Sequence, residues 1–167
     1  GVQSDGRRER SARSREQVLD ALLALLGEGH YSPSMQELSE RAGVSRRLVF
    51  QLFRDAESMH TAFVERQQAS LRELFTPIPD SLPLPTRILS LCEQRARIYE
   101  KITHTRRAGM IREYASPMIR RGLTMFRALK RAQVAAIFAP EIRSCHESVQ
   151  QEIEAALAAA ASFNTWE

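Results

Sequence analysis

The chain has 167 residues, of which 43% are hydrophobic and 26% charged, with a formal net charge of +4 at pH 7. This composition is typical of a soluble globular protein that has one core, or a small domain followed by a larger one. No apolar run is long enough to span a bilayer, and the first residues lack the apolar stretch of a signal peptide. We therefore expect a cytoplasmic protein without a membrane partner.

The first fifteen residues form a basic segment with five arginines and two acids. Because so polar a segment has few apolar side chains to bury, we expect residues 1–13 to be a flexible basic arm. Two interpretations of this arm remain open. A basic arm can follow the minor groove or the phosphate backbone of DNA, and it can equally be a solubilising tail.

The next segment, 14–58, predicts a domain of three helices. The first runs from about Ser14 to Gly27 and has one broad leucine-rich face. A second helix is predicted to open at Met35, because Ser34 and Glu37 have the spacing of a capping box. Gly43 ends this helix, since glycine adopts the left-handed turn conformation freely.

A third helix is predicted after Ser45, which is a good N-cap. Val49 and Phe53 lie four residues apart and face inward together, so the remaining surface carries groove-reading side chains. Arginine can bond the acceptor edge of guanine, and glutamine can pair with adenine. The candidate DNA-binding residues on this surface are Arg46, Arg47, Phe50, Gln51 and Arg54.

At these residues the sequence resembles the TetR family of bacterial transcriptional regulators. The similarity covers Gln17 to about Met59, including the amphipathic QVLDALLALLGEG, the segment ERAGVS and the aromatic residues of the third helix. It implies a homodimer, more often a repressor than an activator, that binds an operator in double-stranded DNA and responds to a small effector. Carried over by position, the DNA-contacting places fall on Ser34, Gln36, Ser45, Arg46, Leu48, Phe50, Gln51 and Leu52.

Four positions depart from the family pattern. Arg47 stands where the family usually has Gly, Phe50 where it has Tyr, Leu52 where it has His or Tyr, and Ala56 where it has Lys. Three of these departures remove a phosphate-bonding group, and Arg47 and Arg54 are candidates to replace the lost contacts. We expect DNA binding with an unusual operator preference. The alternative is a helical protein-interaction module whose degenerate helix-turn-helix no longer binds DNA specifically.

The rest of the chain predicts further helices and no strand. A connecting helix is expected over 59–76, and the resemblance implies that effector binding moves it. The four prolines of 77–85 predict a linker. The region 86–167 is expected to be a helical ligand-binding and dimerisation domain. Its first helix would have one inward face formed by Ile88, Leu89, Cys92, Ala96, Tyr99 and Ile102. A short helix between Thr105 and Tyr114, a long one from Pro117 to near Phe138, and a last one from Pro140 would follow.

Two groups of residues in the C-terminal domain are candidate binding residues. A polarizable and aromatic effector pocket would be lined by Cys92, Tyr99, Met110, Tyr114, Met118 and Phe126. The last helix has an apolar stripe and many alanines, which allow close helix approach, so it is a candidate dimer interface. That stripe consists of Ile142, Val149, Ile153, Leu157 and Ala160.

One segment of this domain is strongly basic, since residues 97–131 hold ten cations and two acids. These cations are either a solvated face or the flank of a pocket for an anionic effector, with an apolar effector as the other possibility. The four histidines have no metal-ligand spacing, and no nucleophile, base and acid arrangement is visible. We therefore expect no enzyme activity, no catalytic residue, no metal and no cofactor.

Overall fold

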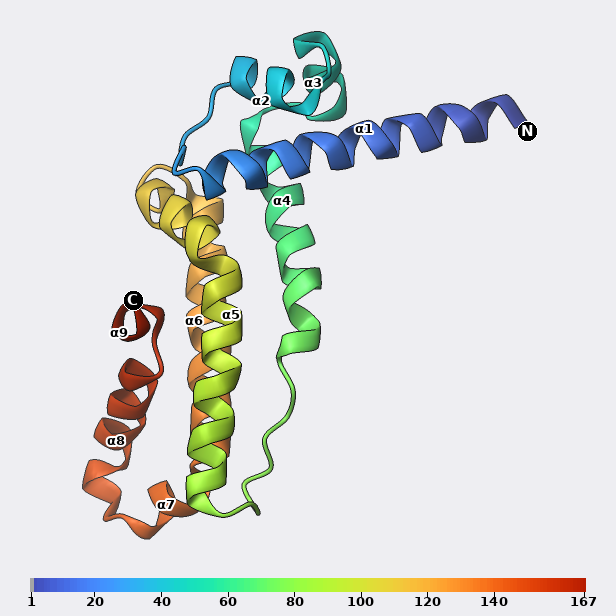
Figure 1. Cartoon of the computed structure of the whole chain (residues 1–167). Coiled ribbons are helices and arrows are strands. Elements are labelled where there is room, and N and C mark those ends of the chain that lie inside the picture. Colours follow the sequence, from blue (N-terminus) through green and yellow to red (C-terminus); the bar gives the residue numbers. More distant parts are fainter. Residues whose placement is uncertain (1) are drawn as a thin grey trace. The chain divides into compact units, whose positions relative to one another are not determined.

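The computed structural model describes residues 2–167, with side chains from residue 6 onward. Within this range the chain is helical and has no strand, which confirms the all-α fold class (Figure 1). The helices are α1 (Val2–Gly27), α2 (Met35–Ala42), α3 (Arg46–Leu52), α4 (Ala56–Leu71), the 3₁₀ helix η1 (Arg72–Leu74), α5 (Leu84–Arg112), α6 (Pro117–Ile137), α7 (Ala139–Ser144), α8 (Glu147–Ala160) and α9 (Phe163–Trp166).

The described chain divides into two compact units. The first unit contains the residues up to Ser70 together with His104–Arg112, and the second contains Leu71–Thr103 together with Glu113–Glu167. This division differs from the expected domains, because most of α4 and the end of α5 belong to the first unit. The proline-rich segment 77–85 lies within the second unit and leads into α5.

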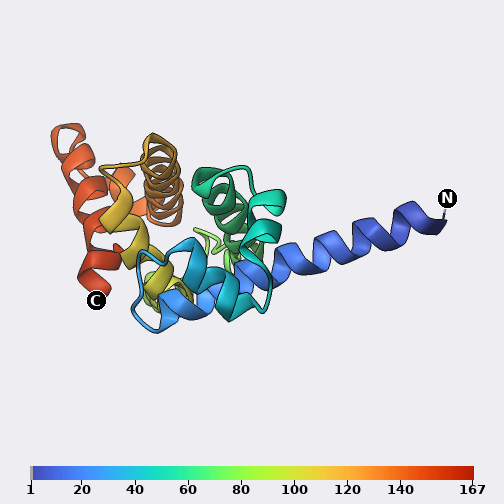
Figure 2. The same cartoon turned by 90° about the horizontal axis from the view of Figure 1, so that it is seen from above.

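The first unit is built on the apolar face of α1. Figures 1 and 2 show α2 and α3 beside the C-terminal half of this helix. One cluster of buried side chains joins α1 to the following helices, because the leucines of α1 recur at helical spacing and meet one or two apolar residues from each partner. The cluster includes Val18, Leu19, Leu22, Leu25, Leu26, Leu38, Val49, Phe53, Met59 and Phe63.

The segment expected to be a flexible arm is helical from Val2, so that expectation was wrong about its conformation. Its first residue lies outside the described part of the chain. Once the leucine-rich half of α1 has formed, extending it costs much less than starting a new helix, and Arg and Glu are good helix formers. Residues 7–13 are exposed, and Figures 1 and 2 show this end of α1 beyond the other helices of its unit.

In the second unit, α6 packs against α7 and α8, and two apolar clusters form the core. Both clusters take side chains from α5. The first contains Leu71, Ile98, Tyr99, Ile102 and Phe163, and the second contains Leu91, Val134, Ile137, Phe138 and Ile142. The Tyr99 ring meets the Phe163 ring edge to face, with centroids 5.5 Å apart.

Two predicted helix boundaries in the C-terminal region were wrong. No separate helix begins near Thr105, because α5 continues without a break to Arg112. The helix predicted from Pro140 is divided into α7 and α8 at Cys145 and His146, where the backbone is extended and the His146 side chain caps α8. The predicted start of α6 is confirmed, since Ser116 caps the helix and Pro117 follows.

The buried face of α5 also differs from the predicted one. Ile88, Leu89 and Cys92 were expected to face the core but are exposed, whereas Arg87 and Arg95 are buried. The buried side of α5 is therefore rotated about its axis relative to the face that hydrophobicity alone indicates. Arg87 is partnered there, because its guanidinium donates to the Glu141 carboxylate and to the carbonyls of Leu82 and Ile137.

The turn between α2 and α3 depends on Gly43, which has a φ of 66°. An added Cβ at this position would meet no atom within 4 Å, so the cost of Gly43→Ala comes from the left-handed backbone alone. We expect this substitution to lower the free energy of unfolding by about 1–2 kcal/mol, measured by urea denaturation. Gly27→Ala is the control, because its site is equally open and its φ is not positive. Equal effects of the two substitutions would contradict the prediction.

Candidate nucleic-acid interface

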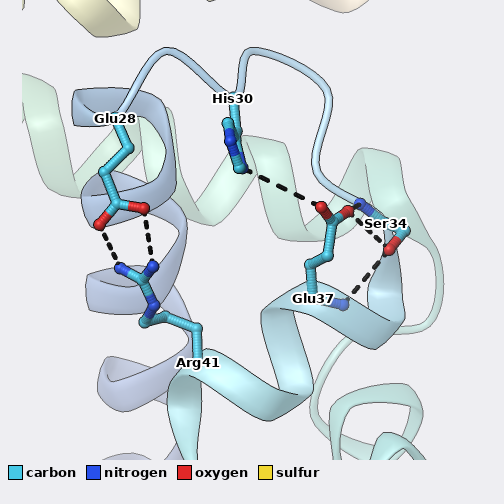
Figure 3. A network of polar contacts seen from close by, with 5 residues as sticks. All are labelled: Glu28, His30, Ser34, Glu37 and Arg41. Atoms are coloured by element: carbon cyan, nitrogen blue, oxygen red, sulfur yellow. Dashed lines mark hydrogen bonds and ion pairs between the residues drawn. The ribbon is translucent and has the colours of Figure 1, made fainter.

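The N-terminus of α2 is closed by its own side chains (Figure 3). The Ser34 N–H donates to Glu37 Oε2 at 2.8 Å, and the Glu37 N–H donates to Ser34 Oγ at 3.3 Å, which confirms the capping box. The Ser34 N–H lowers the pKa of the Glu37 carboxyl, which His30 approaches to 4.0 Å. Two N–H groups at this end of α2 are therefore occupied, and the Glu37 carboxylate lies beside them, so Ser34 acts as a cap.

Arg41 belongs to the scaffold of the turn. Its guanidinium makes two hydrogen bonds to the Glu28 carboxylate, of 2.6 and 2.7 Å, which tie α2 to the residue after α1 (Figure 3). This pairing lowers the pKa of the Glu28 carboxyl. Arg41 therefore offers no unpaired charge to an external anion. On α2, Gln36 donates to Glu40 and is held by an acidic neighbour.

The α3 surface presents the remaining candidate residues to solvent. Arg46, Arg47, Phe50 and Gln51 are exposed, and Leu48 is half-buried. Arg46 and Arg47 form no ion pair with any residue that the structure describes, so both guanidinium groups are available to an external acceptor. The Arg54 side chain is 91% exposed, with its Nε 3.3 Å from Asp55 Oδ2.

The opposite side of α3 is fixed to the core of the first unit. Val49 is fully buried, and Phe53 follows it after one turn. Ser45 caps the helix by accepting a hydrogen bond from the Leu48 N–H. One side of this short helix is thus anchored while the other is open, which is the arrangement that a groove-binding helix needs.

Arg15 is a positioning residue that the sequence interpretation placed in the basic segment. Its guanidinium donates to the Leu52 carbonyl at 3.3 Å and lies over the Phe53 ring, 4.7 Å from the centroid. It therefore holds the C-terminal end of α3 against α1. The signal was present in the sequence, because Arg15 precedes Val18 and Leu19 by three and four residues and shares their helix face.

The six candidate effector residues differ widely in exposure. Tyr99 is buried in the core, Tyr114 is 90% exposed, and Cys92 is exposed. Met110 belongs to the first unit, whereas the other five belong to the second. Met118 and Phe126 are half-buried. The aromatic and sulfur-containing side chains were grouped by chemical type, which does not indicate how exposed each one is.

A groove in the second unit lies between α6 and α8 and has a volume of about 490 Å³. None of the six candidate effector residues lines it. Its wall on α6 is basic, and its wall on α8 is composed of alanines. The lining residues are Arg127, Ala128, Lys130, Arg131, Val134, Ala155, Ala158, Ala159, Ala161 and Ser162.

The predicted dimer stripe on the last helix packs mostly inside the second unit. Ile142 is 4% exposed, and Ile153 and Leu157 pack against the same apolar cluster. Val149 and Ala160 remain exposed, so a free stripe of five residues is not present. Ile142, Ile153 and Leu157 thus have partners in the core of the same chain. Apolar side chains that the second unit leaves exposed include Leu82, Leu84, Ile88, Leu89, Met125 and Leu129.

His60 connects α4 to the end of α5 within the first unit. Its Nδ1 faces the Ala56 carbonyl and its Nε2 faces an Arg112 guanidinium nitrogen. These contacts fit a neutral imidazole that donates from Nδ1 and accepts at Nε2. Burial lowers the pKa of His60 below its ordinary value of 6.5, and the Arg112 charge adds to this effect, opposed more weakly by Glu57.

The first unit is therefore expected to lose stability as the pH falls from about 7 through the ordinary histidine pKa of 6.5. In this range the unfolded chain binds a proton at residue 60 that the folded chain does not, whereas above pH 7 neither state does. The carboxyls with lowered pKa values act only at lower pH. Urea denaturation across this range should give a slope that His60→Gln removes and His104→Gln, at an exposed histidine of the same unit, retains. An unchanged slope in His60→Gln would rule the mechanism out.

No helix in the described range combines the length and the apolar character needed to cross a bilayer. Among the described residues, no three His, Cys, Asp or Glu side chains are grouped so that they could hold a metal ion. Comparisons of the chain with family models, with curated proteins and with solved structures find no match. The geometry of the chain alone therefore defines the candidate interface. It is a short helix that is anchored on one side and presents two arginines and a glutamine on the other.

Proposed function

We propose that this protein is a sequence-specific DNA-binding transcriptional regulator, similar to the TetR family, that acts as a homodimer and responds to a small ligand. One observation carries the proposal. The exposed side of α3 presents Arg46, Arg47 and Gln51, and the two arginines have no ion-pair partner in the described chain. The capped helix α2, the turn at Gly43 and the capped helix α3 follow one another in the order expected of a helix-turn-helix.

In this proposal α3 enters the major groove of the operator. Arg46 and Arg47 offer planar guanidinium groups to the acceptor edge of guanine, and Gln51 offers its amide to adenine. Arg54, which is almost fully exposed, bonds the phosphate backbone. Arg15 and the buried Val49 fix the angle of α3, so that the three base-contacting side chains keep a constant register.

A homodimer would present two copies of α3 to two half-sites with a fixed spacing. A ligand that changes this spacing would release the DNA, which is the repressor behaviour that the resemblance implies. Because three of the five stripe residues pack against the core of the second unit, we place the dimer contact on the exposed apolar residues of α5 and α6, such as Leu89, Met125 and Leu129. Sedimentation of the wild type and of Leu129→Glu tests this contact, and a monomeric wild type would exclude it.

A second candidate function is favoured by Phe50, which is 49% exposed at the centre of the α3 surface. An exposed aromatic side chain of this kind is a frequent anchor in protein interfaces. With Leu52 and Ala56 in place of polar family residues, α3 would then bind another protein. This alternative predicts that DNA binding is weak and independent of sequence.

A fluorescence-anisotropy titration separates the two functions. The full-length protein is titrated against a short duplex from its own upstream DNA and against a scrambled duplex, at several salt concentrations. Tight binding to the native duplex alone is the result expected of a sequence-specific regulator. Equal and weak binding to both duplexes, controlled by salt, would overturn the proposal and direct the search to protein partners.

The basic N-terminal half of α1 gives a separate prediction. Arg7, Arg8, Arg10 and Arg13 are exposed on it. If this half touches phosphates, deletion of residues 1–12 should weaken binding to all duplexes and reduce the slope of log K against log salt, because fewer counterions are released. The same titration measures the slope. If the slope is unchanged, this part of the chain is a solubilising extension.

A further inference from the structure

Arg95 is a buried cation that the described chain does not neutralise. It is 3% exposed, and none of its three guanidinium nitrogens has a hydrogen-bond partner. Burial lowers the pKa of this guanidinium, although arginine stays charged at neutral pH. A buried charge without an acceptor is strongly unfavourable. An acceptor for Arg95 is therefore expected from outside the chain.

Arg87 provides an internal comparison for Arg95. It lies two turns earlier on the same helix and is equally buried. The fold supplies Arg87 with the Glu141 carboxylate and with two backbone carbonyls. Two buried arginines on one side of α5 thus differ in one respect, which is that only Arg87 has its counter-charge within the protein.

Arg95 does not line the groove between α6 and α8, but its neighbours on α5 contact a residue that does. Arg95 is four residues after Leu91 and four before Tyr99, so all three share one helix face. Leu91 belongs to the cluster on which Ala161 packs, and the Tyr99 hydroxyl donates to the Ala161 carbonyl at 2.5 Å. Ala161 lines the groove.

The lining of the groove has the chemistry of a site for an amphipathic anion. Its charged residues are Arg127, Lys130 and Arg131, and no acid is among them. Arg127 pairs with Glu113, and Lys130 lies over the Tyr99 ring, 5.0 Å from the centroid. Arg131 is exposed and forms no ion pair with the described residues. The facing wall of alanines is apolar, and a volume of about 490 Å³ admits a small ligand.

We propose that the α6–α8 groove binds a small amphipathic carboxylate, with its alkyl body along the alanines of α8 and its carboxylate bonded by Arg131 and attracted at longer range by the buried charge of Arg95. Binding would bring a counter-charge toward Arg95, which has none within the described chain. The role of this groove as the effector site of a regulator rests on the proposed function. The binding of a carboxylate to the groove does not.

Isothermal titration calorimetry of the full-length protein with decanoate tests the site without DNA. Decanol, which has the same chain but no charge, should bind at least about tenfold more weakly, since a charge-assisted bond to arginine is lost. Arg131→Gln should weaken decanoate binding by about tenfold. Arg121→Gln, which removes an exposed arginine from α6 outside the groove lining, is the matched control and should bind decanoate as the wild type does.

Arg95→Met separates a ligand-binding role from a structural one. Methionine keeps most of the apolar volume and removes the charge, so the variant should have a higher Tm than the wild type and should lose decanoate binding. A lower Tm with unchanged decanoate affinity would overturn the inference, as would equal affinity for decanoate and decanol. Because neither measurement involves DNA, failure of the operator titration leaves this result standing, and the reverse also holds.

Discussion

Replacing both Arg46 and Arg47 by alanine is expected to abolish sequence-specific DNA binding. Each arginine paired with a base contributes about 1–3 kcal/mol of discrimination, so the affinity for the native duplex should fall at least about 30-fold. The stability of the first unit should hardly change, because both side chains are exposed and unpaired in the described chain. Anisotropy titration at one salt concentration measures the loss of affinity.

A matched control removes the adjacent arginines of α6, Arg120 and Arg121, which also changes the charge by two. This variant should bind the native duplex nearly as well as the wild type. If Arg46→Ala with Arg47→Ala weakens binding to native and scrambled duplexes equally, the two arginines contact phosphates and not bases. If it weakens neither, α3 is not the DNA-binding surface.

Leu38→Ala is expected to have the largest effect on stability. Leu38 is fully buried in the cluster that joins α1, α2 and α3. Truncation leaves a cavity in a small core, and the free energy of unfolding should fall by about 2–5 kcal/mol. Urea denaturation followed by circular dichroism measures this change, and DNA affinity should decline with the folded fraction.

Phe50→Ala distinguishes the surface of α3 from its core. Phe50 is 49% exposed, so its truncation should change stability by less than about 1 kcal/mol. It should nevertheless alter binding at the α3 surface, to DNA or to a protein. A loss of stability as large as that of Leu38→Ala would mean that Phe50 belongs to the core, contrary to the structure.

The first unit was predictable because its signals are local. A capping box needs only Ser34 and Glu37, and a left-handed turn needs only Gly43, so the sequence determines where α2 begins and ends. The inward positions Val49 and Phe53 follow from one helical period. The helix in residues 2–13 was missed, because composition indicates which segments can bury apolar surface but not how far an existing helix extends.

The second unit was less predictable because its signals are not local. The burial of Arg87 depends on Glu141, which is 54 residues away, and no periodicity in α5 indicates that partner. The apolar stripe of α8 fits a dimer interface and an internal core equally well, and packing within the chain decides between them. Residues grouped by chemical type, such as Tyr99 and Tyr114, fall on opposite extremes of exposure.

The shortness of α3 has a consequence for amide hydrogen exchange. With seven residues, α3 is too short to persist alone, so its backbone hydrogen bonds open when the core beneath it opens. Its amide protons should therefore exchange with solvent at nearly the rate of those around Leu22 in α1. The amides of residues 7–13, on an exposed helical end, should exchange much earlier. The protection of the α3 amides from exchange thus reports whether the whole first unit is folded.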